Sequence, residues 1–65
     1  QQQYDAALAD LITAINIDNQ NGETFYLRGN IKQRKGDTTG ACTDWKKAKS
    51  LGYNNADTQI KLNCK

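Results

Sequence analysis

Histidine, methionine and proline are all absent from this sequence of 65 residues. Without histidine the chain lacks the commonest general base, and it contains neither a glycine-rich phosphate loop nor a nucleophile elbow. We therefore expect no enzymatic activity and no cofactor. The lack of proline removes the strongest helix breaker, so long helices are compatible with the whole chain.

Thiols are scarce, because Cys42 and Cys64 are the only cysteines. Two thiolates without histidine cannot complete a four-coordinate zinc site within this chain. Their spacing is also not that of a Cys-x-x-Cys redox motif. We expect no metal site. No apolar run approaches the roughly 20 residues of a membrane span, so direct membrane insertion is not expected either.

The size and charge of the chain favour one small domain with a thin core. Hydrophobic residues make up 37% and charged residues 25%, which is typical of a folded rather than a disordered chain. The formal net charge of +2 is too small to indicate a nucleic-acid partner. The chain opens on Gln1 without a methionine, and we expect a fragment or processed product that works within a larger chain or complex.

Apolar residues recur every three or four positions in four segments, which predicts an all-α fold. The expected helices are 4–17, 22–35, 38–51 and a short helix that ends near residue 63. Turn and cap residues separate them: Asn21, Asp37 or Thr38, and Asn54 or Asn55 as N-caps, with Gly36 and Gly52 as C-terminal stops. Short connections of this kind favour antiparallel neighbours.

The same spacing predicts which side chains face inward. In the first two helices these are Tyr4, Ala7, Leu8, Leu11, Ile12, Ala14, Ile15, Phe25, Leu27, Gly29 and Ile31. In the last two they are Ala41, Cys42, Trp45, Ala48, Leu51, Ala56, Ile60 and Leu62. Because Gly29 and Ala41 lie at similar distances from Gly36, we expect them to face each other and to let the two backbones approach closely. Phe25 and Trp45 should then fill the wider ends of the hairpin.

An internal repeat relates segment 4–17 to segment 38–51 at an offset of 34 residues. The aligned pairs are Ala7 with Ala41, Leu8 with Cys42, Asp10 with Asp44, Leu11 with Trp45, Ala14 with Ala48, Ile17 with Leu51, and Gly22 with Ala56. This period, in helix–turn–helix units, is that of tetratricopeptide repeats. The alternative is a generic helical hairpin that matches by chance.

The chain resembles the tetratricopeptide repeat family where that family places bulky, small and turn residues. These positions are Phe25, Gly29, Gly36, Asp37, Ala41, Trp45 and Ala48, and Arg28-Gly29-Asn30 is a common variant of the first helix. The resemblance implies a single domain over 1–65 in which antiparallel hairpins stack as a right-handed solenoid. Within it, 1–18 would be the second helix of one repeat, 22–55 one complete repeat and 56–65 a C-terminal capping helix. The sequence departs from the family at the usual proline, replaced by Asn19 and Tyr53, and at Lys32, where an aromatic is preferred.

The resemblance also implies a role in protein–protein interaction or scaffolding. The first helix of each repeat in this family lines a concave groove that receives a peptide or a partner helix. Carried over, the groove residues are Glu23, Tyr26, Asn30, Gln33 and Arg34. Asn30 is the sharpest candidate, because a carboxamide can both donate to and accept from a peptide backbone. The alternative is a merely solvated helix face.

Other functional interpretations stay open. One is a purely structural C-terminal cap of a longer repeat protein, and another is a small helical nucleic-acid binder. The cations Lys32, Arg34, Lys35, Lys46, Lys47 and Lys49 alternate with Glu23, Asp37 and Asp44, as on most solvated helix faces. Interleaved aromatics of a nucleic-acid platform are missing, so no nucleic-acid partner is expected.

The two cysteines lie at equal distances from the turn near Tyr53, so an antiparallel helix pair would bring them level. A disulfide between Cys42 and Cys64 is therefore geometrically possible, and it would imply an oxidising compartment. The alternative is a small core residue at Cys42 and a terminal thiol at Cys64. A similar Gly-Ala-Cys…Trp…Cys pattern ends many repeat proteins of bacterial envelopes. That resemblance favours the bridge and a periplasmic, cell-envelope or extracellular location; reduced cysteines would favour the cytoplasm.

Overall fold

A computed structural model describes residues 3–64, which form four α-helices and, within that range, no strand. The helices are α1 (Tyr4–Ile17), α2 (Gly22–Arg34), α3 (Thr38–Ser50) and α4 (Ala56–Asn63). This confirms the predicted all-α fold, with α2 and α3 each ending one residue before the expected limit. The predicted domain limits at residues 1 and 65 lie outside the described residues.

Side-chain caps and two glycines set the helix ends. Asn21 Oδ1 accepts a hydrogen bond from the Glu23 backbone N–H at 3.1 Å, and Asp37 Oδ1 accepts one from Gly40 N–H at 2.9 Å. Gly36 and Gly52 adopt positive φ angles of 91° and 95°, a conformation that other residues rarely adopt. Of the two alternatives for the third helix, Asp37 is therefore the N-cap.

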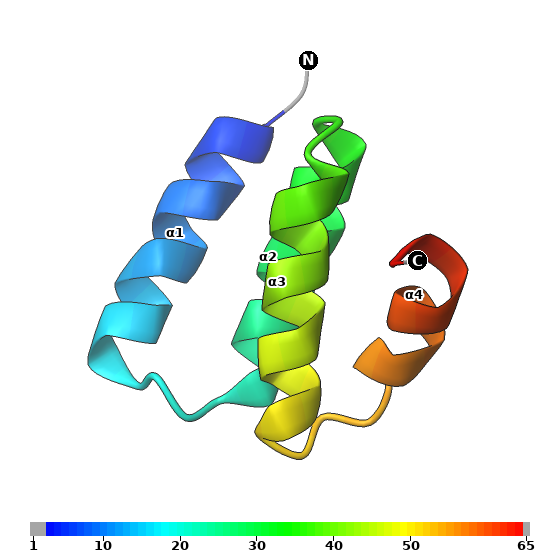
Figure 1. Ribbon diagram of the computed structural model, residues 1–65. Helices are drawn as coiled ribbons and strands as arrows, with labels where there is room; N and C mark the ends of the chain where they lie inside the picture. The colour runs from blue at the N-terminus through cyan, green and yellow to red at the C-terminus, as the bar shows by residue number, and fades with distance from the viewer. Residues whose placement is uncertain (1–2, 65) are drawn as a thin grey trace.

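The α2–α3 hairpin forms the centre of the molecule (Figure 1). Helix α1 packs against α2 on one side, and α4 packs against α3 on the other. Sequential helices therefore lie side by side, as expected when connections are short. The two outermost helices, α1 and α4, each pack against one neighbour along most of their length. Each therefore has one packed side and one side without a neighbouring helix along most of its length.

The core lies between α2, α3 and the start of α4, where Phe25, Ala41, Trp45, Ala48 and Ala56 are buried. The expected close approach is present: a Cβ placed on Gly29 would lie 3.1 Å from the Ala41 carbonyl oxygen. The same Cβ would lie 2.7 Å from Cδ1 and Nε1 of Trp45. Trp45 thus covers Gly29 at the point of close approach.

Three residues predicted to face inward are exposed instead. Leu27 is 42% exposed and Leu62 65% exposed, and Ile12 in α1 is also exposed. Residues two positions apart lie about 200° apart on a helix, so Leu27 points away from the face that carries buried Phe25 and Gly29. The same argument separates Leu62 from half-buried Ile60.

Candidate protein-interaction surfaces

A buried ion cluster joins α2 to α3. The Asp44 carboxylate is only 2% exposed and accepts two hydrogen bonds from Arg28, from Nε at 2.9 Å and from Nη2 at 2.8 Å. Lys32 Nζ lies 3.2 Å from the same carboxylate. This bidentate geometry raises the pKa of Arg28, chiefly through the hydrogen bond to Asp44, against an opposing effect of partial burial.

Sequence reasoning missed this cluster, because it placed Asp44 among the charges of a solvated face. That interpretation is wrong for Asp44, which is buried. A signal was present: Arg28 and Asp44 lie equally far from Gly36, so an antiparallel hairpin brings them level. The same equal spacing about a turn did predict the cysteine pair.

The predicted groove residues divide into two groups. Three of them make contacts within the molecule. Asn30 Oδ1 accepts a hydrogen bond from Trp45 Nε1 at 3.0 Å, and Gln33 Nε2 donates to Asn63 Oδ1 at 2.8 Å. The Tyr26 ring packs at 5.0 Å, centroid to centroid, on the ring of Tyr53.

The other two groove residues, Glu23 and Arg34, are exposed near opposite ends of α2. Of the first three, Tyr26 lies against Tyr53 in the connection between α3 and α4, and Gln33 is bonded to Asn63 of α4. The structure gives Asn30 a structural role at the Trp45 indole. A substitution of Asn30 would therefore disturb the core as well as any groove, whereas Glu23 and Arg34 can be changed without losing a described hydrogen bond.

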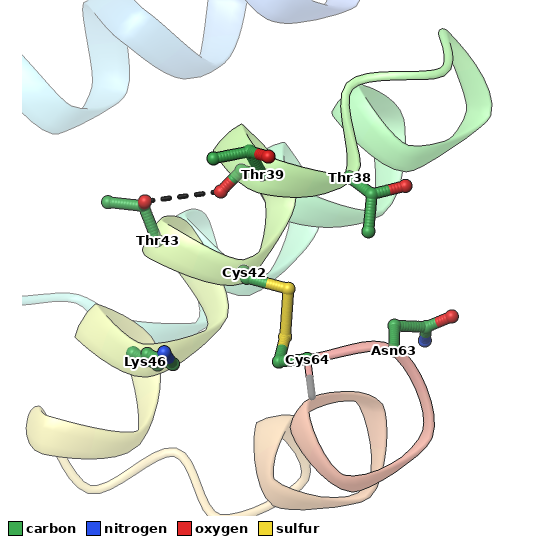
Figure 2. A pocket seen from close by; sticks show the side chains of 7 residues that line it. All are labelled: Thr38, Thr39, Cys42, Thr43, Lys46, Asn63 and Cys64. Atoms are coloured by element: carbon green, nitrogen blue, oxygen red, sulfur yellow. Dashed lines mark hydrogen bonds between the residues drawn. A yellow bond between two sulfur atoms is a disulfide. The ribbon is translucent and has the colours of Figure 1, made fainter.

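The Cys42–Cys64 disulfide is present, with the two Cα atoms 5.8 Å apart. It joins the first turns of α3 to the end of α4 (Figure 2). One ion pair adds to this attachment, since Lys49 Nζ of α3 lies 2.6 Å from Asp57 Oδ1 of α4, and Lys61 Nζ, within α4 itself, lies 3.0 Å from Asp57 Oδ2. The last helix is therefore held at both its beginning and its end.

A pocket of about 310 Å³ lies beside the disulfide (Figure 2). Its lining residues are Thr38, Thr39, Cys42, Thr43, Lys46, Asn63 and Cys64. The Thr43 hydroxyl already donates to the Thr39 carbonyl at 3.2 Å, and Lys46 is the only ionisable side chain among these residues. The pocket contains no acid–base pair, and it does not coincide with the predicted groove.

Helix α1 exposes a side that its repeat partner α3 buries. We call this side the outer face of α1; it consists of Ala7, Asp10, Leu11, Ala14 and Ile17. At the equivalent positions of the third helix, four residues of α3 are buried against α2, and Leu51, the C-cap of α3, is half-buried. On α1 none of the five is buried: Ala7, Leu11 and Ala14 are half-buried, Asp10 is exposed and Ile17 is 81% exposed. The outer face therefore has the pattern of a packed helix without the helix that would cover it.

Paired helices that repeat at a fixed offset define a helical-repeat protein. The chain belongs to the tetratricopeptide repeat family, because the family model described as TPR repeat matches residues 1–36, more than half of the chain. Such repeats generally mediate protein–protein interaction or scaffolding, and the family is typically non-enzymatic. Searches of curated proteins and of solved structures gave no significant match.

Within 3–64 no group of histidine, cysteine, aspartate or glutamate residues is arranged to hold a metal ion. In the same range, every helix is too short or too polar to cross a membrane.

Proposed function

We propose that this chain is a protein–protein interaction module that joins a larger helical assembly through the outer face of α1. The observation that carries the proposal is the contrast between the repeat-related helices: α3 is covered on this face, and α1 is not. Exposed Ile17 and half-buried Leu11 and Ala14 offer apolar surface whose burial would stabilise an assembly. In repeat proteins stability is a sum over such neighbouring contacts.

The same proposal gives α4 the role of a terminal cap in a right-handed solenoid. Support comes from its attachment to α3 through the disulfide and through the Lys49–Asp57 ion pair. We also propose an oxidising location such as a bacterial periplasm or cell envelope, because a disulfide of this kind persists where thiols are not kept reduced. The concave groove along α2 stays a prediction, and substitution of Glu23 or Arg34 is its cleanest test.

Site-specific photo-crosslinking tests the interaction surface. A photoreactive phenylalanine analogue placed at Ile17 should yield an adduct with a defined partner protein when the chain is expressed in its source cells. The matched control carries the same analogue at Thr58, which is exposed on α4. Adducts that form at Thr58 and not at Ile17 would show that partners bind another surface and would contradict the proposal.

A further inference from the structure

The Cys42–Cys64 disulfide can be reached from solvent. Both cysteines are half-buried, and both line the pocket of about 310 Å³ in which Figure 2 shows their sulfur–sulfur bond. Thiol–disulfide exchange needs an attacking thiolate to approach one of the sulfur atoms, so a bridge sealed in a core is inert and a bridge in an open pocket can react. Access alone therefore makes this disulfide a candidate for exchange.

A positive charge lies next to the bridge on the same side of α3. Thr38, Cys42 and Lys46 follow one another at four-residue intervals, and all three line the pocket. Among residues 3–64, no carboxylate lies within ion-pair distance of Lys46. Its ammonium group is therefore free to stabilise a thiolate at Cys42, one helical turn away.

The two sulfur atoms are not equivalent as leaving groups. Cys42 lies in the first turns of α3, nearer the positive end of that helix, whereas Cys64 is the C-cap of α4 and lies at the negative end of its helix. Together with Lys46, this arrangement favours a thiolate at Cys42 over one at Cys64. Because the more stable thiolate leaves faster, an incoming thiolate is directed to Cys64.

We propose that this pocket is a site of thiol–disulfide exchange, in which a dithiol attacks Cys64 Sγ and expels Cys42 as a thiolate beside Lys46. In the first step one sulfur of the dithiol bonds to Cys64, the Cys42–Cys64 bond breaks, and its electron pair stays on Cys42 Sγ. The second sulfur of the dithiol then displaces Cys64. Two electrons and two protons pass from the dithiol to the cysteines, and the dithiol becomes a disulfide. The reverse reaction closes the bridge by the same route.

Opening the bridge acts on the end of α4. The beginning of this helix stays attached through buried Ala56 and through the ion pair between Lys49 and Asp57. The end keeps the hydrogen bond between Gln33 and Asn63 but loses its covalent link. Exchange therefore makes the end of α4 a redox-dependent part of the surface. It is independent of the outer face of α1, which lies on the other side of the central hairpin (Figure 1).

The rate of reduction by dithiothreitol tests the role of Lys46. Oxidised protein is mixed with excess dithiothreitol in native buffer, samples are alkylated at intervals, and mass spectrometry counts the labelled thiols. Lys46→Glu should slow opening about fivefold, because the new carboxylate repels the attacking thiolate and destabilises a thiolate at Cys42. Lys47→Glu is the matched control, since it makes the same change of charge at the next, exposed residue, which does not line the pocket. It should stay within about 1.5-fold of wild type.

A second pair of variants tests the route through the pocket. Thr38→Trp adds bulk one turn before Cys42 and should slow opening about threefold or more, because less room is left for the attacking sulfur. Thr58→Trp, at an exposed residue of α4 that does not line the pocket, should leave the rate unchanged. Unfolding would expose the disulfide and speed its reduction, so a misfolded variant cannot imitate the expected slowing.

Reduced thioredoxin, used in place of dithiothreitol, distinguishes the source of the dithiol. Slowing by Lys46→Glu and Thr38→Trp with both reagents means that the pocket accepts small and protein dithiols alike. Slowing with only one reagent supports the exchange site and restricts it to that class. Equal rates in wild type and in both variants, with either reagent, would show that the bridge opens without using the pocket and would overturn the inference.

The attacked sulfur is identified by trapping. Thioredoxin whose second active-site cysteine is replaced by serine cannot complete the reaction, so the mixed disulfide accumulates. After acid quenching and alkylation, peptide mapping should place this adduct on Cys64 and the alkyl label on Cys42. An adduct mainly on Cys42 would contradict the proposed direction of attack and the role given to Lys46.

Discussion

Asp44 shows how a single polar residue can organise a thin core. It is buried between two helices, yet both cations that neutralise it keep part of their side chains in solvent, 21% for Arg28 and 28% for Lys32. Such an arrangement lowers the desolvation cost of the cations while the carboxylate is fully hydrogen-bonded. Charge pairing at Asp44, as well as the shape of the packed side chains, can therefore fix the register of α2 against α3.

Asp44→Asn should lower the free energy of unfolding by about 2–3 kcal/mol, since it leaves Arg28 and Lys32 without a buried counter-charge. Asp10→Asn is the matched control, because it makes the same change at the repeat-equivalent exposed position and should stay within about 0.5 kcal/mol of wild type. Urea denaturation followed by circular dichroism measures both. Equal effects of the two substitutions would show that the ion cluster contributes nothing specific.

Gly29→Ala tests the close contact between α2 and α3. Alanine favours a helix over glycine by about 1 kcal/mol, but the new Cβ would meet the Trp45 indole and the Ala41 carbonyl oxygen. We expect a net loss of about 1–3 kcal/mol, as for other overpacked sites. Asn16→Ala, on the exposed side of α1, should be neutral or stabilising in the same urea denaturation experiment.

At the scale of elements, α4 is the helix that depends most on covalent attachment. It has eight residues, of which only Ala56 is buried. A helix of this length is not stable in water by itself. The disulfide and the charges around Asp57 therefore supply much of what holds it against α3.

The Cys42→Ala/Cys64→Ala double variant should lose about 3 kcal/mol, the chain-entropy value for a 22-residue separation. Amide hydrogen exchange should show the loss first in α4, while α2 and the middle of α3 keep their protection. Reductant should shift wild-type protein in the same way and leave the double variant unchanged. Loss of protection across all helices at once would contradict a local role.

The pH dependence of the α3–α4 contact follows from Asp57. Hydrogen bonds from Lys49, and secondarily from Lys61, hold the pKa of Asp57 below its ordinary value of 3.8. Because the folded pKa is the lower one, the ionised carboxylate stabilises the fold above about pH 3.8, and this stabilisation is lost as the pH falls through the folded pKa.

Wild-type protein should therefore lose more stability than Asp57→Asn when the pH falls from about 5 to about 3. Urea denaturation at the two pH values, repeated in high salt, measures the difference. Salt should reduce it, because these charges are partly exposed. An identical pH dependence in the two proteins would rule out this contribution of Asp57.

At the scale of the whole molecule, packing is uneven: α2, α3 and the start of α4 form the core, and α1 contributes no buried residue. The apolar side chains of α1 are divided between a side that packs on α2 and the outer face. Ile15 and Ile17 represent these two sides on the same helix.

Ile15→Ser should destabilise the isolated chain by about 1–2 kcal/mol, because its side chain packs against the core. Ile17→Ser should stay within about 0.5 kcal/mol, since its side chain is already in water. Thermal or urea unfolding of both variants measures the contrast. A large loss from Ile17→Ser would mean that the outer face already supports the isolated fold.

The local features of this fold could be predicted from the sequence because they depend on neighbouring residues. Apolar spacing predicted four helices, Asn21 and Asp37 predicted caps, and Gly36 and Gly52 predicted the points where helices stop. Equal spacing about a turn predicted the Cys42–Cys64 pair. The 34-residue period predicted the family.

Only the tertiary structure decided which helix faces are covered. Periodicity could not exclude Leu27 or Leu62 from the core, since burial depends on where a neighbouring helix lies. It also could not separate Asp10 from Asp44, two aspartates in equivalent positions of the repeat, of which one is buried in an ion cluster and the other exposed. The sequence by itself determined the helices and their order; packing alone determined which charges are neutralised, because desolvation acts only where another helix excludes water.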